Sequence, residues 1–186
     1  MQISTTDYNI RQCLKRMFTS VGSPAIDGAG GTVNNIEVNN FAVTIKDGSP
    51  NELTTYAKFV LMKGAVPTDF SGLTVPSSRS SDRLVEWTVA STAGAWVEEG
   101  ANSIYLQSTD LATASQSGTA TWLWWYNPYW TNFNYTTIGI SHQAVFTVGE
   151  LGSGSDYELA NVGIINGKGY KLVNGPKLSL ATEYTY

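Results

Sequence analysis

Histidine and cysteine, two residue types that commonly carry out catalysis, each occur once in this sequence. The one histidine, His142, has no cysteine or carboxylate near it at a spacing typical of a metal site or a catalytic triad. The one cysteine, Cys13, is followed by Leu14, whereas a reactive thiolate needs an exposed, electropositive setting. Because a site is built from several converging groups, we expect structural roles for both residues, no metal and no cofactor.

Paired carboxylates are the other candidates for catalysis. Two pairs stand out, Glu98 with Glu99 and Asp82 with Glu86. Two carboxyl groups at the right separation can serve as the acid and the nucleophile of a glycoside hydrolase. Adjacent residues of a strand point to opposite faces, so Glu98 and Glu99 cannot both face one substrate unless the strand breaks there. We therefore expect solvated charges and no enzymatic activity, and a hydrolase built on such a pair is an alternative.

Aromatic side chains are the most distinctive feature of the sequence. They crowd into one predicted strand and the loop behind it: Trp122, Trp124, Trp125, Tyr126, Tyr129, Trp130, Phe133 and Tyr135. In a strand, Trp122, Trp124 and Tyr126 share one face, and Leu123 and Trp125 share the other. Both faces are apolar, which predicts a central strand that is buried on both sides.

The loop at 127–135 mixes aromatic residues with Asn and Thr, a combination typical of a contact surface. The predicted interaction surface consists of Tyr126, Tyr129, Trp130, Phe133 and Tyr135. We favour a contact with a protein neighbour, since aromatic hot spots are common at protein interfaces. Simple burial and stacking against sugar rings are the alternatives, and the platforms in the sugar alternative are Trp124, Trp125, Tyr129 and Trp130.

The composition favours β structure, because 12% of the residues are aromatic and only 14% are charged. The net charge of -4 comes without a basic block, so nucleic acid is not an expected partner. Charges within the first twenty residues argue against a secretory signal, and no segment has the length of an apolar membrane span, so we expect no membrane contact. A single cysteine excludes an internal disulfide framework and fits synthesis in a reducing cytoplasm.

Alternating patterns predict many short strands after residue 35. They lie at 36–45, 53–62, 85–89, 93–106, 119–126, 143–148, 156–162, 170–173 and 178–184. The Gly-rich segment 149–154 and the Asn166-Gly167 pair predict hairpin connections. Apolar residues at helical spacing predict one helix between Thr6 and Phe18. We therefore expect a mainly β protein, an antiparallel β-sandwich or jelly-roll-like barrel with one short N-terminal helix. Residues 1–31 would form the helix and a linker arm, and residues 32–186 a single β-sandwich domain.

The C-terminal half resembles a known class of proteins. The matching stretches are Ser117–Trp122, Ala144–Gly149, Gly152–Leu159 and Val162–Tyr170. In their strand and turn pattern they resemble small β-rich virion structural proteins of tailed bacteriophages, whereas the segment 127–135 has no counterpart in that pattern. Such families offer no active-site residues to carry over.

The resemblance implies a role in a phage particle. The expected function is a non-enzymatic capsid decoration or cement protein that stabilises the phage head through subunit contacts. Its expected partners are the major capsid protein or head and tail neighbours, together with further copies of itself in a homo-oligomer. The expected location is the virion, after assembly in the host bacterial cytoplasm. The alternative is a tail or fibre component whose β-sandwich binds carbohydrate through aromatic platforms.

Overall fold

The computed structural model describes residues 35–39, 42–46, 53–70, 73, 79–88, 96–99, 103–106, 111–130, 138–172 and 175–179. The strands are β1 (Asn35–Asn39), β2 (Ala42–Lys46), β3 (Leu53–Tyr56), β4 (Lys58–Met62), β5 (Arg83–Thr88), β6 (Trp96–Glu99), β7 (Ser103–Leu106), β8 (Ala112–Thr113), β9 (Gly118–Thr119), β10 (Trp122–Trp130), β11 (Ile138–Glu150), β12 (Tyr157–Leu159), β13 (Gly163–Ile164), β14 (Gly169–Tyr170) and β15 (Lys177–Ser179). A 3-10 helix, η1, spans Ser80–Asp82, and there is no α-helix within the described ranges. The predicted mainly β class is confirmed, whereas the predicted helix and linker lie outside the described residues.

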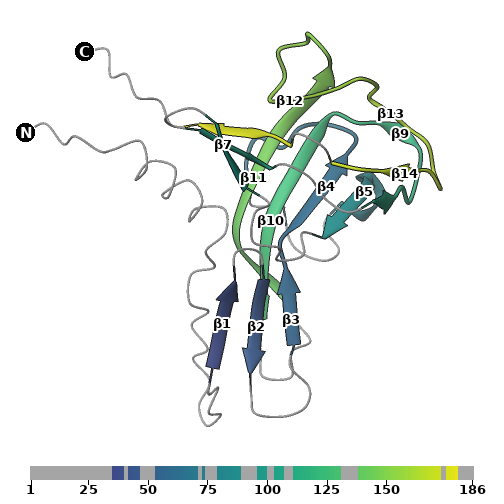
Figure 1. The fold of residues 1–186 in the computed structure, drawn as a ribbon. Helices are drawn as coiled ribbons and strands as arrows, with labels where there is room; N and C mark the ends of the chain where they lie inside the picture. Colours follow the sequence, from purple (N-terminus) through teal and green to yellow (C-terminus); the bar gives the residue numbers. More distant parts are fainter. Residues whose placement is uncertain are drawn as a thin grey trace, which may run out of the picture.

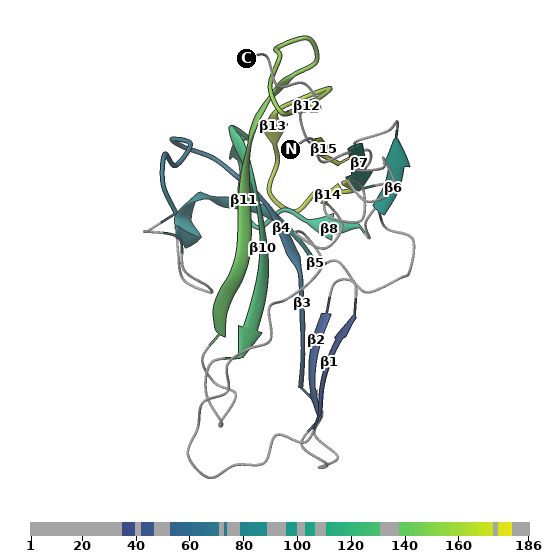
Figure 2. The same ribbon diagram turned by 90° about the vertical axis from the view of Figure 1, so that its left-hand side faces the viewer.

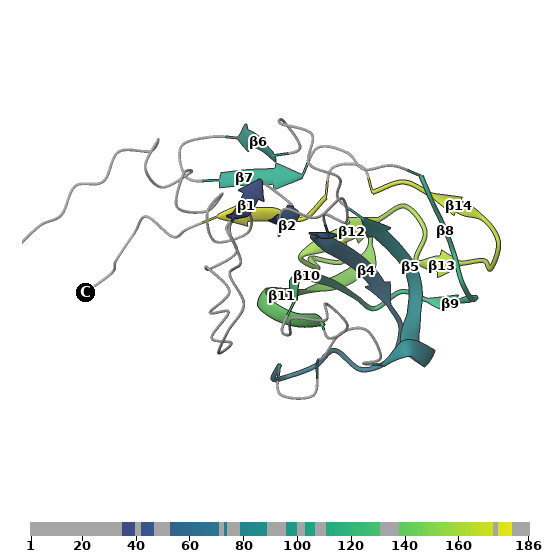
Figure 3. The same ribbon diagram turned by 90° about the horizontal axis from the view of Figure 1, so that it is seen from below.

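A five-stranded sheet in the order β12-β11-β10-β4-β5 forms the centre of the fold. Its long strands curl along their length, as Figure 1 shows, and the curl is also visible from below in Figure 3. β10 lies in the middle, where Trp124 is paired with Val145 of β11 on one side and with Val60 of β4 on the other. These pairings are antiparallel, as is the pairing of β4 with β5. The aromatic strand is therefore the central strand that the sequence predicts.

Smaller sheets surround this centre. β1, β2 and β3 form an antiparallel sheet beside the far ends of β10 and β11 (Figure 2), and β3 leads through the buried Ala57 into β4. β15, β7 and β6 form another three-stranded sheet. The segments 112–119 and 163–170 run antiparallel, with Ala112 paired to Tyr170 and Gly118 paired to Ile164. The Asn166-Gly167 turn is present, but its two flanking strands pair with β9 and β8 and not with each other.

Both faces of the central strand β10 are buried. One core is built from Ala57, Phe59, Leu61, Leu84, Val85, Trp87, Ala114, Ala120, Leu123, Trp125, Phe146, Val148, Tyr157, Ile164 and Leu172. The other is built from Val60, Met62, Leu73, Trp122, Trp124 and Tyr126. The two faces predicted for the aromatic strand are confirmed. Leu123 and Trp125 belong to the first core, whereas Trp122, Trp124 and Tyr126 belong to the second. Large aromatic side chains bury much apolar area at little entropic cost, which suits this position.

β10 extends beyond the predicted end of the strand at Tyr126. It continues to Trp130, so residues 127–130, predicted as the start of a loop, are strand. Proline has no backbone N–H, so Pro128 cannot donate a hydrogen bond to a neighbouring strand. Here the register with β11 shifts between Asn127 and Pro128, and such a bulge is a position where a sheet tolerates proline. The proline that reads as a strand breaker in the sequence is therefore absorbed by an irregularity in pairing.

The hairpin predicted at 149–154 is wrong. β11 and β12 are neighbours but run parallel, with Val148 opposite Tyr157. The short return is made possible by Gly152 and Gly154, whose φ angles of 83° and 75° lie in the left-handed region. It is held by Thr147, whose backbone N–H donates to Asp156 Oδ2 at 2.8 Å. A Gly-rich segment signals a tight return of the chain but not the direction of the next strand.

Candidate functional site

The second core of the sheet holds a row of three rings, which we call the aromatic strip: Trp122, Trp124 and Tyr126. Their neighbouring ring centroids lie 6.4 Å and 4.4 Å apart, and the rings are tilted. Arg79 and Arg83 lie over Trp122 and Trp124, each with Cζ 5.3 Å from the ring centroid. This distance is within the range of an attractive cation–π contact. The strip and its two arginines therefore bring aromatic and charged side chains together on one face of the sheet.

A β-bulge places Arg83 on this face. Leu61 is paired with Val85 and Met62 with Arg83, so Leu84 is an extra residue in β5. Leu84 and Val85 are consecutive in sequence, yet both belong to the first core. In a regular strand Arg83 and Glu86 would point to opposite faces. The bulge re-aims Arg83, which brings it to the same face as Glu86 and over Trp124.

Arg79 is positioned by an unusual backbone conformation. Its φ of 49° and ψ of 40° are left-handed, an uncommon conformation for a residue with a side chain. It precedes η1, and Asp82 N–H donates back to Arg79 O at 2.9 Å. Arg79 Nε then reaches Asp82 Oδ2 at 3.0 Å while the guanidinium covers Trp122. The turn before β5 therefore holds the positive charge of Arg79 over the ring of Trp122.

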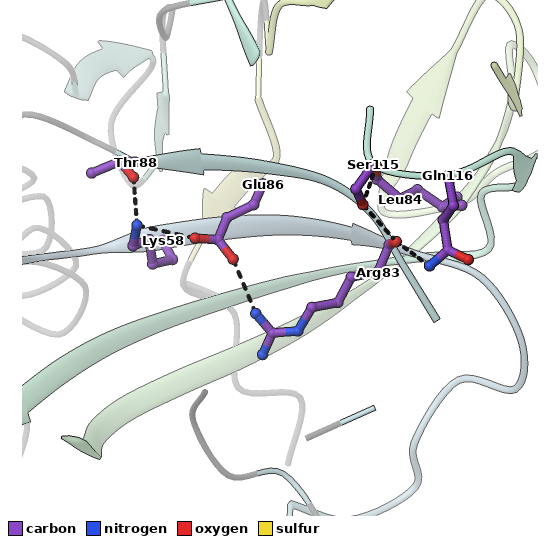
Figure 4. Close-up of polar contacts among 7 residues, drawn as sticks. All are labelled: Lys58, Arg83, Leu84, Glu86, Thr88, Ser115 and Gln116. Carbon is purple, nitrogen blue, oxygen red and sulfur yellow. Dashed lines mark hydrogen bonds and ion pairs between the residues drawn. The ribbon is translucent and has the colours of Figure 1, made fainter. Parts of the chain in front are cut away.

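A chain of ion pairs follows the edge of the strip and is drawn in Figure 4. Glu86 receives Arg83 Nη1 at 3.0 Å through one carboxylate oxygen and Lys58 Nζ at 3.0 Å through the other. Lys58 also donates to Thr88 Oγ1. The indole N–H groups are bonded too: Trp124 Nε1 donates to Gln143 Oε1 at 3.0 Å, and Trp122 Nε1 donates to Lys63 O at 3.3 Å. These side chains around the strip thus form ion pairs and hydrogen bonds within the chain.

Burial governs the protonation of the phenol at the end of the strip. Burial raises the pKa of Tyr126 to about 12, and the negative charge of Glu86 acts in the same direction. The charge and hydrogen bond of Arg83 oppose this rise. In the first core, burial alone raises the pKa of Tyr157 to about 12. Both phenols are neutral well beyond neutral pH, so neither is suited to act as a base there.

Of the two candidate carboxylate pairs, the structure describes the side chains of Asp82 and Glu86. Asp82 is paired with Arg79, and Glu86 with Arg83 and Lys58. Glu98 and Glu99 are consecutive positions of β6, opposite Ile104 and Ser103 of β7. The described residues include no group of three or more His, Cys, Asp and Glu side chains that could hold a metal ion. Nor does any helix within those residues have the length and apolar character needed to cross a membrane.

The predicted interaction surface is divided by the structure. Tyr126 is only 2% exposed and belongs to the buried aromatic strip, because alternation in β10 turns it into the second core. Tyr129 and Trp130 lie in β10 with their backbones opposite Gly139 and Ile138. The surroundings of their side chains, and Phe133 and Tyr135 as a whole, lie outside what the structure describes. For these four residues the contact surface stays a prediction.

Two of the four platforms in the sugar alternative are buried. Trp124 is 0% exposed and Trp125 is 1% exposed, so neither ring face is open to a sugar.

His142 is placed in β11 with its backbone opposite Asn127, and Cys13 lies outside the described residues. The roles of Arg79 and Arg83 were not predicted from the sequence. A left-handed turn directs Arg79 and a bulge directs Arg83, and neither feature is marked by a motif or by period-two alternation. Comparison with protein-family models, curated proteins and solved structures found no match.

Proposed function

We propose that this chain is a non-enzymatic structural protein of a tailed-phage particle, a capsid decoration or cement protein that stabilises the head through subunit contacts. The observation that supports it is the internal use of the aromatic strip. Trp122, Trp124 and Tyr126 are at most 2% exposed, and the arginines over the strip are ion-paired within the chain. This chemistry gives rigidity to a sheet and presents no converging groups to a substrate. The choice of a phage particle rests on the sequence resemblance.

The arrangement of the sheets into one domain is also part of the proposal. We propose an antiparallel sandwich- or jelly-roll-like domain over residues 32–186. The support is the burial of both faces of β10, because a sheet with two apolar faces needs covering layers on both sides. Several of the described layers are short strand pairs such as β13 with β9 and β14 with β8. An assembling protein of this kind would use the predicted contact residues Tyr129, Trp130, Phe133 and Tyr135 on its neighbours.

The test is binding to heads of the phage whose genome encodes the chain. Purified protein is mixed with empty and DNA-filled heads, and the mixture is separated on a density gradient. Saturable, stoichiometric co-sedimentation is expected, together with greater resistance of the heads to heat. Trp130→Ala should weaken binding, whereas the matched control Phe70→Ala should not, because Phe70 is an exposed aromatic residue outside the predicted surface. Protein that stays at the top of the gradient, with tryptophan fluorescence that responds to oligosaccharides, would favour the sugar alternative.

A further inference from the structure

The turn between β13 and β14 presents an Asn-Gly pair to solvent. Asn166 and Gly167 are its two central residues, and the turn is closed by Lys168 N–H, which donates to Ile165 O at 3.2 Å. The φ of Gly167 is 76°, a left-handed value that favours glycine. Beyond the adjacent residues, no described atom lies within 4 Å of the position that a Cβ would take at Gly167. The peptide nitrogen that follows Asn166 is therefore not shielded by a side chain.

An Asn-Gly pair with this freedom is open to intramolecular deamidation. The backbone nitrogen of Gly167 attacks Cγ of Asn166, and the new C–N bond closes a five-membered succinimide ring. The Cγ–Nδ2 bond breaks, and Nδ2 leaves as ammonia with the proton that the Gly167 nitrogen gives up through solvent. Water then opens the ring at Cγ, which gives aspartate, or at the backbone carbonyl carbon, which gives isoaspartate. The overall reaction is a hydrolysis that needs no reactant besides water.

The fold holds the attacking nitrogen in a hydrogen bond. Gly167 N–H donates to Ala114 O at 3.0 Å, and Asn166 N–H donates to Ser117 Oγ at 2.9 Å. Ring closure removes the proton that the bond to Ala114 uses, so this bond must be released before the nitrogen can attack. Deamidation in the folded chain therefore requires the turn to move away from residues 114–117.

The pairings that hold the turn in place are short. On one side of it β13 pairs with β9, on the other β14 pairs with β8, and each of these strands has two residues (Figure 3). Residues 165–169 are all exposed. Segments with short pairings and exposed backbone hydrogen bonds open at a lower free-energy cost than the whole fold. The turn can thus open while the five-stranded sheet stays intact.

We propose that Asn166 is a site of spontaneous deamidation, and that the hydrogen bond from Gly167 N–H to Ala114 O is the gate that sets its rate. The product carries a carboxylate in place of the amide. Isoaspartate also lengthens the main chain by one carbon, so Gly167 N–H no longer keeps its register with Ala114 O. Modification would therefore detach the turn from residues 114–117. This inference does not depend on the proposed function.

The first experiment compares deamidation of the full chain in the folded state and in guanidinium chloride at mildly alkaline pH. Mass spectrometry of chymotryptic peptides locates the product at Asn166, and a zero-time sample corrects for conversion during digestion. Conversion in the folded chain should be slower by about tenfold or more. Asn166→Gln should abolish the product at this turn, because the longer side chain must close a six-membered ring. Equal rates in the two states would overturn the gate, and a folded chain that never reacts would overturn the local opening.

The second experiment loosens the gate without changing the reacting pair. Ser117→Ala removes the acceptor of Asn166 N–H, so the folded-state rate should rise by about two- to tenfold, as for the loss of one neutral hydrogen bond. Amide hydrogen exchange of Gly167 should rise by the same factor, whereas the rate in guanidinium chloride should be unchanged. The matched control Ser153→Ala removes an exposed hydroxyl from the segment 149–154 and should alter none of these values.

Amide exchange of the wild type tests the opening directly. Gly167 should exchange faster than the core amide of Leu123, because the turn opens while the sheet stays closed. Equal protection of the two amides would contradict a local opening, and it decides the question even if Ser117→Ala is unstable. A folded-state deamidation rate that Ser117→Ala leaves unchanged would overturn the gate.

Discussion

The guanidinium of Arg83 lies over the indole of Trp124, with Cζ 5.3 Å from the ring centroid. The contact exists because the extra residue Leu84 turns Arg83 toward the aromatic strip. Trp124 is fully buried, so the cation meets the ring in a largely desolvated setting where such a contact is strongest. Glu86 holds the other side of the guanidinium. The charge is therefore part of the packing of the sheet.

Replacing Arg83 should destabilise the chain more than replacing Arg79. Arg83→Met removes the charge over Trp124 and should lower the free energy of unfolding by about 1–3 kcal/mol. Arg79→Met is the matched control, because its cation–π distance is the same but its side chain is 30% exposed against 13% for Arg83. We expect a loss below about 1 kcal/mol for Arg79→Met. Urea denaturation measures both, and equal losses would contradict the role given to burial.

Truncating the bulge residue Leu84 should destabilise the fold as much as truncating a residue at a regular core position. Leu84 is 0% exposed, so Leu84→Ala should cost about 2–4 kcal/mol of unfolding free energy through the cavity it leaves. Leu151→Ala makes the same change at a side chain that is 69% exposed and should stay within about 0.5 kcal/mol. Chemical denaturation followed by circular dichroism gives both values. A small loss at Leu84 would mean that the bulge does not direct this side chain into the core.

Much of the sheet could be predicted from the sequence, but the arrangement around the strip could not. Alternation along β10 placed Trp122 and Leu123 on opposite faces, because period two follows from strand geometry, and the structure shows a buried core on each face. A bulge such as that at Leu84 adds a residue without changing residue type, so the position of Arg83 was not visible. The parallel pairing of β12 was missed for a similar reason, since glycines at 152 and 154 permit a return in either direction.

Alkaline pH should destabilise the fold. Burial raises the pKa of Tyr126 and Tyr157 to about 12, from a usual value of 10.0. Their contribution is fully present below pH 10 and is lost as the pH rises toward 12, because the unfolded chain releases its phenol protons first. Each tyrosine contributes up to about 2–3 kcal/mol to this fall. Tyr126→Phe should flatten the dependence of unfolding free energy on pH in this window. An unchanged slope would contradict a buried phenol at this position.

Acid should loosen the return between β11 and β12. The N–H groups of Gly152 and Gly154 donate to Glu158 at 2.9 Å and 2.7 Å, and these bonds lower the pKa of the carboxyl. The contribution is therefore present above the usual carboxyl pKa and is lost as the pH falls through the lowered value. In NMR titrations the amide shifts of both glycines should follow the protonation of Glu158. Glu158→Gln should remove this response, whereas Glu150→Gln should preserve it.

Electron cryomicroscopy of the phage particle most directly tests our proposal that the chain is one of its structural components. Density that fits the curled five-stranded sheet should repeat over the outer surface of the head according to its symmetry, with the predicted contact residues at subunit boundaries. Its absence from purified particles, at a resolution that traces the major capsid protein, would contradict the claim.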